Sequence, residues 1–321
     1  MITWSLGGGF SNLEFFTQLL DVINFYKPKK HRFAVFDAPF GCKWEGGRPF
    51  VDHPSTDKEL NKVIDYYNNY NIGFNFVFTN SLLKEEHVTD KRCNYFLERH
   101  HNRLNGVIVS NDILADHVKN NFPDYTLIYS LTHGKSRVSD LNFYKRAQEK
   151  YDIVVLVPDL NTKFNFIRKL EPSRLEILIN ETCFYGCRYR TLHYRTIDWL
   201  NLNQDRSIQR DIHRFCCIHD ADLMSMTDRQ VRNIKGLKLK VDQIQQLMDL
   251  GVQNFKVSGR LLNPKANTFR ADIINLVFPF LGIPEIALRV EVSGRFGGPS
   301  NEVISKKIKS IANRVQKKLK Q

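Results

Sequence analysis

Four of the six cysteines occupy positions where their thiols could bind one metal centre. Cys183 and Cys187 are separated by three residues and follow a strand-like segment directly, and Cys42 follows an earlier one. Cys216, with its neighbour Cys217 as the alternative, lies further along the chain. Thiolates are soft ligands that suit iron–sulfur clusters and tetrahedral zinc. The sequence therefore predicts a metal site on Cys42, Cys183, Cys187 and Cys216.

A [4Fe–4S] cluster is the preferred occupant, with zinc as the alternative. A radical-SAM cluster requires a third cysteine soon after the close pair, but Arg190 stands at that position. Zinc could recruit histidines in place of thiolates, and three lie nearby in sequence: His193, His213 and His219. The sixth cysteine, Cys93, lies in a helix-like segment and is interpreted as a small buried apolar residue.

The candidate catalytic residues surround the cysteine pair in sequence. Glu181 precedes the pair, and His193 and Tyr194 follow it, so that all three could transfer a proton or hydrogen-bond a substrate. A histidine that only hydrogen-bonds within its loop is the alternative for His193. No Gly-x-Ser-x-Gly or His-Glu-x-x-His motif occurs in the sequence, which argues against known proteolytic machinery.

Polar and basic residues at other strand ends are candidates for binding an anionic substrate. Lys256 and Arg260 flank the end of the last strand-like segment, Arg48 follows the second, and Asn180 follows the seventh. Guanidinium and ammonium groups bind carboxylates and phosphates, and arginine does so with two hydrogen bonds. Structural ion pairs with Asp37 or Glu181 are the alternative role for these cations.

The pattern of the whole chain predicts the scaffold that would bring these residues together. Short β-rich runs alternate with helix-length stretches, such as 13–25 after Asn12 and 57–70 after Ser55 or Thr56, which is typical of successive βα units. We count eight such runs, at residues 2–6, 32–36, 73–78, 106–109, 126–129, 152–157, 175–179 and 254–257. The prediction is a (β/α)₈ barrel, whose strand C-terminal ends carry the active site.

Two features depart from a simple barrel. More than seventy residues separate the seventh and eighth runs, so we expect a long insertion after the seventh strand. A further strand-like run at 286–292 and a basic amphipathic helix at the end of the chain predict a short C-terminal appendage. We therefore expect a barrel over residues 1–283 and an appendage over residues 284–321.

Composition narrows the class of protein and its partners. Hydrophobic residues make up 42% of the 321 residues and charged residues 25%, which is ordinary for a folded globular chain. The chain has no signal-peptide pattern and no apolar run long enough to span a membrane, so we expect a cytoplasmic protein. Its net charge of +13 favours anionic partners, with nucleic acids or nucleotides among them.

The residues around the cysteines also resemble a known family. The segment 175–183, the pair Cys187 and Arg188, the later Cys216 and the segment 251–260 are similar to the peptidase U32 family. This resemblance covers the second half of the chain, whereas the first half matches by strand pattern alone. The longer glycine- and cysteine-rich signature of the family is largely missing.

The resemblance implies a barrel that holds a [4Fe–4S] cluster on four cysteines. It also implies oxygen-independent hydroxylation of RNA bases or of a quinone precursor, with a small anionic co-substrate such as prephenate as oxygen donor. Two alternatives remain open: a non-catalytic, metal-stabilised subunit that scaffolds a partner barrel, and a zinc-dependent hydrolase.

Overall fold

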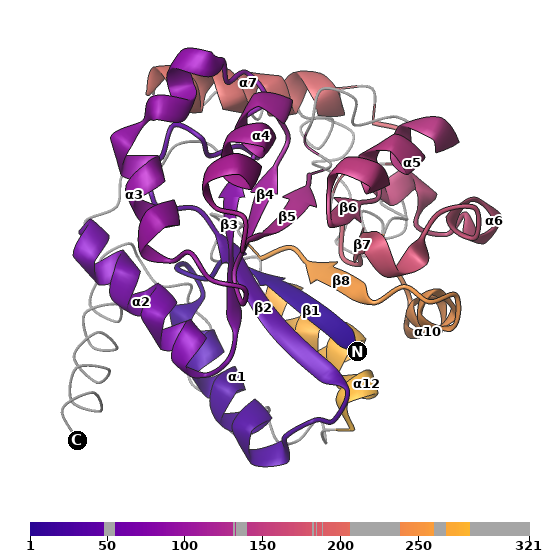
Figure 1. Cartoon of the computed structure of the whole chain (residues 1–321). Coiled ribbons are helices and arrows are strands. Elements are labelled where there is room, and N and C mark those ends of the chain that lie inside the picture. The colour runs from indigo at the N-terminus through magenta and orange to yellow at the C-terminus, as the bar shows by residue number, and fades with distance from the viewer. Residues whose placement is uncertain are drawn as a thin grey trace, which may run out of the picture.

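Eight parallel strands close into a barrel in the computed structural model of the chain (Figure 1). The structure describes residues 1–47, 55–130, 132, 140–181, 183, 185–187, 189–205, 238–259 and 268–282. Each strand pairs with its neighbours in sequence, and β1 pairs with β8 to complete the ring. The strands are β1 (Ile2–Gly7), β2 (His31–Asp37), β3 (Gly73–Phe78), β4 (Gly106–Val109), β5 (Thr126–Tyr129), β6 (Ile153–Val155), β7 (Leu175–Leu178) and β8 (Asn254–Val257).

Helices connect consecutive strands and cover the outside of the barrel (Figure 1). Two of them, α7 and α10, both lie between β7 and β8, which confirms the prolonged seventh crossover. The α-helices are α1 (Leu13–Tyr26), α2 (Asp57–Asn69), α3 (Lys91–Arg99), α4 (Asp112–Asn121), α5 (Leu141–Lys150), α6 (Phe164–Ile167), α7 (Arg190–Asn203), α10 (Val241–Asp249), α11 (Thr268–Asp272) and α12 (Phe278–Leu281).

The alternation of side chains along each strand divides the apolar core in two. Phe74, Phe76 and Phe78 of β3 point outward and pack into the large layer between the barrel and its helices. Val77 points inward instead. It belongs to a cluster inside the barrel, here called the lumen cluster, which consists of Phe36, Ala38, Val77, Ile108, Ile128, Val155 and Leu178. A packed interior of branched and aromatic side chains is the usual filling of such barrels.

Two predicted helix starts have different outcomes. Thr56 caps α2 as expected, because its hydroxyl accepts from the Glu59 backbone N–H and the Glu59 carboxylate accepts from the Thr56 N–H. Asn12 stands at the N-cap of α1, but its side chain makes no capping hydrogen bond. Its Nδ2 instead donates to the Gly259 carbonyl oxygen at 2.8 Å, and so ties α1 to the end of β8.

Glycines allow the first and last strands to meet at the barrel seam. A Cβ on Gly7 would lie 2.7 Å from the Gly259 nitrogen, and one on Gly259 would lie 2.6 Å from the Gly7 carbonyl oxygen. Real Cβ atoms do not approach backbone atoms so closely, so any side chain at either position would push the two strand ends apart. The Gly7-Gly8-Gly9 run therefore has a structural role in closing the ring.

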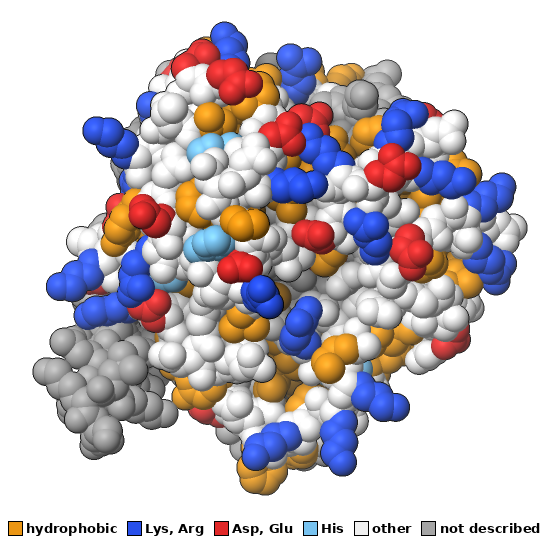
Figure 2. All heavy atoms as spheres, viewed as in Figure 1, with side chains coloured by type: hydrophobic (Ala, Val, Ile, Leu, Met, Phe, Trp, Pro, Cys, Tyr) orange, Lys and Arg blue, Asp and Glu red, His pale blue; other side chains and the backbone are white. Residues whose placement is uncertain are grey.

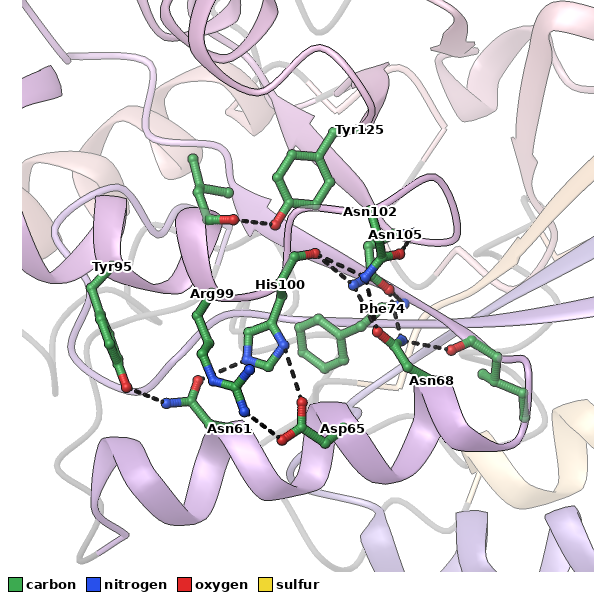
Figure 3. A network of polar contacts seen from close by, with 12 residues as sticks. Asn61, Asp65, Asn68, Phe74, Tyr95, Arg99, His100, Asn102, Asn105 and Tyr125 are labelled. Carbon is green, nitrogen blue, oxygen red and sulfur yellow. Dashed lines mark hydrogen bonds and ion pairs between the residues drawn. The ribbon is translucent and has the colours of Figure 1, made fainter.

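The opposite, amino-terminal end of the barrel is held by a network of polar side chains from α2, α3 and the loop before β4 (Figure 3). His100 Nε2 lies 2.7 Å from Asn61 Oδ1, and Asn61 Nδ2 donates to the Tyr95 hydroxyl at 2.9 Å. Asn105 Oδ1 accepts from the Phe74 N–H at 2.8 Å, which fixes the start of β3. Contacts at this end of a barrel contribute to stability rather than to catalysis.

His100 should make the stability of the protein depend on pH. Burial, aided by the nearby Arg99, lowers the pKa of His100 to about 3 although Asp65 Oδ1 lies 3.6 Å from its Nδ1, so the folded protein holds it neutral while the unfolded chain protonates it below pH 6.5. Acidification from pH 7 to 5 should therefore cost about 2 kcal/mol through this residue. His100→Gln should be less stable than wild type at pH 7 and should lose this contribution. Urea unfolding of both proteins at pH 7 and pH 5 measures their free energies of unfolding. A difference between wild type and His100→Gln that is the same at both pH values would contradict the prediction.

The predicted C-terminal appendage, with its strand at 286–292 and its basic helix, lies outside the described residues. Up to Leu281 the chain still covers the barrel, because α11, a π-helical turn (Ile273–Val277) and α12 follow one another and Phe280 packs on Trp4. No helix in the described part of the chain is both long and apolar enough to cross a membrane.

Candidate functional site

Small polar side chains replace the apolar lumen cluster at the carboxyl-terminal mouth of the barrel. Two residues beyond the inward-facing Val77, Ile108, Ile128 and Leu178 come Thr79, Ser110, Ser130 and Asn180, all of them buried. Because side chains alternate along a strand, these residues continue on the inner side. The mouth of the barrel therefore offers hydroxyl and amide groups, as expected of the catalytic end of this fold.

A buried ion pair lies inside the barrel below this polar layer. Lys256 Nζ of β8 lies 3.2 Å from Glu176 Oε2 of β7, and the two side chains are only 11% and 1% exposed. The same ammonium lies 4.3 Å from the centroid of the Phe36 ring, a cation–π contact that further stabilises the charge. The structure thus places the predicted anion-binding residue Lys256 within the barrel, in an ion pair with Glu176, a partner that the sequence did not indicate.

Asn180 joins the loops that follow β7 and β8. Its Nδ2 donates to the Ser258 carbonyl oxygen at 2.9 Å and to Asp272 Oδ2 at 2.8 Å, and its Oδ1 accepts from the Ser258 N–H at 2.7 Å. Lys238 completes the group through an ion pair with Asp272. The side chain of Asn180 therefore connects the loops after β7 and β8. Its role in binding a substrate stays a prediction.

The loop with the cysteine pair is fixed at both of its ends. Glu181 Oε1 accepts from the Cys183 N–H at 2.8 Å. Asp159, which follows β6, accepts from the Gly186 N–H and forms an ion pair with Arg190, whose side chain is 2% exposed. The predicted catalytic residue Glu181 therefore has a visible role in shaping this loop.

Cys183 and Cys187 interact with each other and with Arg190. Burial raises the pKa of the Cys183 thiol to about 12, while the hydrogen bond from Arg190 acts in the opposite direction. Glu181 and Cys187 raise the pKa further through their charges. Metal ions bind the thiolate form, so a metal at Cys183 has to displace a proton.

Cys42 is buried against a different cysteine. It lies in the large outer core, 2% exposed, and its thiol is hydrogen-bonded to that of Cys93. Both Cys42 and the 183–187 loop follow strand C-terminal ends, but in the described part of the chain no three His, Cys, Asp or Glu side chains gather as metal ligands. The described residues thus bring together Cys183 and Cys187, and Cys42 with Cys93.

The N-terminal part of α7 carries the other two predicted catalytic residues. Tyr194 is half-buried and packs against the lumen cluster. The ring of His193 stacks on that of Tyr194, with centroids 6.2 Å apart and planes inclined by 10°. Both side chains therefore stand at the mouth of the barrel, although a proton-transfer role remains a prediction.

Several predicted site residues lie outside the described residues, namely Arg48, Arg260, Cys216, Cys217, His213 and His219. Conversely, sequence reasoning did not single out Glu176, Asp159 or Asp198, which the structure places in the site or next to it. A signal for Glu176 exists in the sequence. Glu176, Leu178 and Asn180 occupy every second position of one strand, so their side chains point to the same side, and Asn180 at the strand end is itself predicted to face the site.

Comparison with known proteins assigns the family. The model of "Peptidase family U32" matches residues 50–271. The uncharacterised protease MJ1657 of Methanocaldococcus jannaschii is 25% identical over 246 residues, which are 73% of this chain and 69% of that protein. The solved structure of the U32 peptidase Mk0906 has the same fold, with a TM-score of 0.51 at 11% identity, over 81% of this chain and 93% of the other. This chain belongs to peptidase family U32.

Proposed function

We propose that this chain is an iron–sulfur enzyme that hydroxylates an aromatic ring or nucleobase without dioxygen, using a small anionic co-substrate. The observation that carries the proposal is the pairing of Cys183 and Cys187 in a loop beside the polar mouth of the barrel. Lys256 supports it, because an ammonium group inside the barrel can attract a carboxylate.

The described residues supply two of the four ligands that a [4Fe–4S] cluster requires. Cys183 and Cys187 fit this role, and Arg190 adds a positive charge that would balance the negative charge of thiolate ligands. Cys42 would have to leave its contact with Cys93 to join them. Under the proposal the cluster supplies electron transfer or a Lewis-acidic iron, and the chain's own residues bind and orient the reactants.

Anaerobic reconstitution with iron and sulfide tests the metal centre. Iron and acid-labile sulfide content, absorption and EPR spectra should show a cluster in wild type, and Cys183→Ala and Cys187→Ala should each lose it. Cys93→Ala, which removes a buried thiol outside the predicted set, is the matched control and should retain it. Cys42→Ala decides whether Cys42 acts as a ligand or only as the neighbour of Cys93. Zinc without sulfide in the wild-type protein would overturn the proposal in favour of a zinc enzyme.

The choice between a nucleic acid and a small molecule as the acceptor is a separate question. The net charge of +13 favours a nucleic acid, but the Lys and Arg side chains on the face shown in Figure 2 are spread out and interspersed with acidic ones. Filter binding of single-stranded RNA at two salt concentrations measures this preference. Affinity that falls steeply with salt supports a nucleic-acid acceptor, and absence of binding favours a small aromatic molecule.

A non-catalytic subunit is the second candidate, and one surface feature favours it. Tyr185, Leu192 and Trp199 are 63%, 53% and 44% exposed on the cysteine loop and on α7, and exposed apolar side chains of this size often mark protein contacts. An enzyme should bind a small dicarboxylate on its own. A scaffold should bind it only in the presence of its partner, and calorimetric titration of the isolated protein separates the two.

A further inference from the structure

Helix α7 crosses the carboxyl-terminal mouth of the barrel from one side to the other. Its 14 residues correspond to a length of about 21 Å at 1.5 Å per residue. Its N-terminal end is bound to Asp159, which follows β6. Its C-terminal half contacts Glu45, which follows β2, and Ser81, which follows β3. In the ring of eight strands, β6 lies opposite β2 and β7 lies opposite β3. Figure 1 shows α7 across the end of the barrel toward which β3, β4 and β5 point.

The N-terminal end of α7 is anchored by an ion pair. Arg190, the first residue of the helix, is buried and pairs with Asp159. Asp159 also accepts from the Gly186 N–H, so the carboxylate binds both the helix and the loop before it. Arg190 also hydrogen-bonds the thiol of Cys183. This end of α7 is therefore continuous with the cysteine loop.

The other end is anchored by Asp198. Its Oδ2 accepts from the Ser81 N–H at 2.9 Å and from the Ser81 hydroxyl at 2.5 Å, and its carbonyl oxygen accepts from Asn80 Nδ2 at 2.8 Å. One turn further on, Asn201 Nδ2 donates to the Glu45 carbonyl oxygen at 2.9 Å. These hydrogen bonds hold the C-terminal half of α7 against the loops that follow β2 and β3.

The anchor at Asp198 differs from the one at Arg190, because its carboxylate forms no ion pair with any of the described residues. Asp198 Oδ1 is fully buried and has no hydrogen-bond partner among the described residues. It faces the backbone near Gly46, where a Cβ would lie 2.6 Å away. Burial raises the pKa of Asp198 to about 7, although Ser81 and Arg195 act to lower it. A buried carboxyl group that is held only by hydrogen bonds from neutral groups is held less firmly than a carboxylate in a buried ion pair.

We propose that Asp198 positions α7 over the inside of the barrel, and that this end of the helix releases when a small anionic ligand enters toward Lys256. Between the two anchors, Tyr194 packs against the lumen cluster, and the ammonium of Lys256 lies deeper, 11% exposed. A ligand that approaches Lys256 from the mouth has to pass α7. The inference extends the proposed function to ligand entry, and it requires neither the metal centre nor the reaction.

Lysine methylation and hydrogen exchange of the intact protein test the proposal without a ligand. With formaldehyde and cyanoborohydride, Lys256 should be methylated much more slowly than the exposed Lys240 in wild type. Asp198→Ala should raise the rate at Lys256 by at least tenfold and speed amide exchange in α7, while the barrel strands remain protected. Asp198→Asn should behave like wild type, because its amide oxygen can still accept both hydrogen bonds from Ser81. Asn203→Ala, an exposed change on the same helix, is the control and should have no effect.

Three results would overturn the proposal. Asp198→Ala could leave both Lys256 and α7 as protected as in wild type. It could also expose the strands together with α7, which would mean that Asp198 serves general stability only. Finally, Asp159→Asn could expose Lys256 where Asp198→Ala does not, which would place the releasing end at the cysteine loop. Loss of the iron–sulfur cluster has no bearing on any of these outcomes, so the two proposals fail separately.

Discussion

Lys256→Met should lower the free energy of unfolding by about 3–5 kcal/mol, because it leaves the carboxylate of Glu176 buried without its cation. Glu176 is 1% exposed, so water cannot replace the lost ion pair. Glu176→Gln should cost less, since the ammonium of Lys256 keeps its contact with the Phe36 ring. Urea unfolding monitored by circular dichroism measures both changes.

The double variant Glu176→Gln with Lys256→Met is the decisive control. A buried ion pair contributes little net stability once its desolvation is counted, so removing both charges should recover much of the loss caused by Lys256→Met. The coupling energy from this cycle should exceed about 1 kcal/mol. If the loss in free energy of unfolding of the double variant equals the sum of the two single losses, Glu176 and Lys256 contribute to stability independently.

Arg190→Met should also destabilise the protein by about 3 kcal/mol and release the cysteine loop. Arg190 is buried, pairs with Asp159 and hydrogen-bonds Cys183, so methionine fills the space but satisfies neither partner. Chemical unfolding gives the stability, and limited proteolysis followed by mass spectrometry shows whether cleavage appears in the loop that contains Cys187.

Two further variants make this prediction specific. Arg146→Met changes an exposed arginine of α5 and should leave both stability and the protease pattern near those of wild type. Arg190→Lys keeps the charge but cannot reproduce the forked geometry of guanidinium, so an intermediate loss is expected. If Arg190→Lys matches wild type, the charge alone holds the loop.

The barrel could be predicted from the sequence because its signals are local. All eight predicted strands are present, with boundaries that differ by at most two residues, as at β6, where Ile153–Val155 replaces the predicted 152–157. Each strand consists of a short apolar or β-branched run that ends in polar residues, and this pattern needs no knowledge of the partner strands. The capping box of Thr56 is local in the same sense.

The contacts between distant segments could not be predicted in the same way. The sequence places Cys42 after a strand, but whether its thiol points to the mouth of the barrel or to the helices depends on the path of one loop, and it lies against Cys93 of α3. The sequence predicts Lys256 as an anion-binding residue at the end of the last strand, with Asp37 or Glu181 as alternative partners, but it does not indicate Glu176. Register across β7 and β8 selects Glu176, and register is a property of the assembled sheet.

The seam between β1 and β8 has a consequence for synthesis on the ribosome. Asn12 and Gly259 are hydrogen-bonded across 247 positions of the chain, so the ring has no closing partner until its last strand has left the exit tunnel. Up to that moment β1 presents an unpaired edge, which is prone to association with other chains. Nascent chains that end before residue 254 should therefore depend on chaperones, whereas chains in which β8 and α12 have both emerged from the tunnel should not.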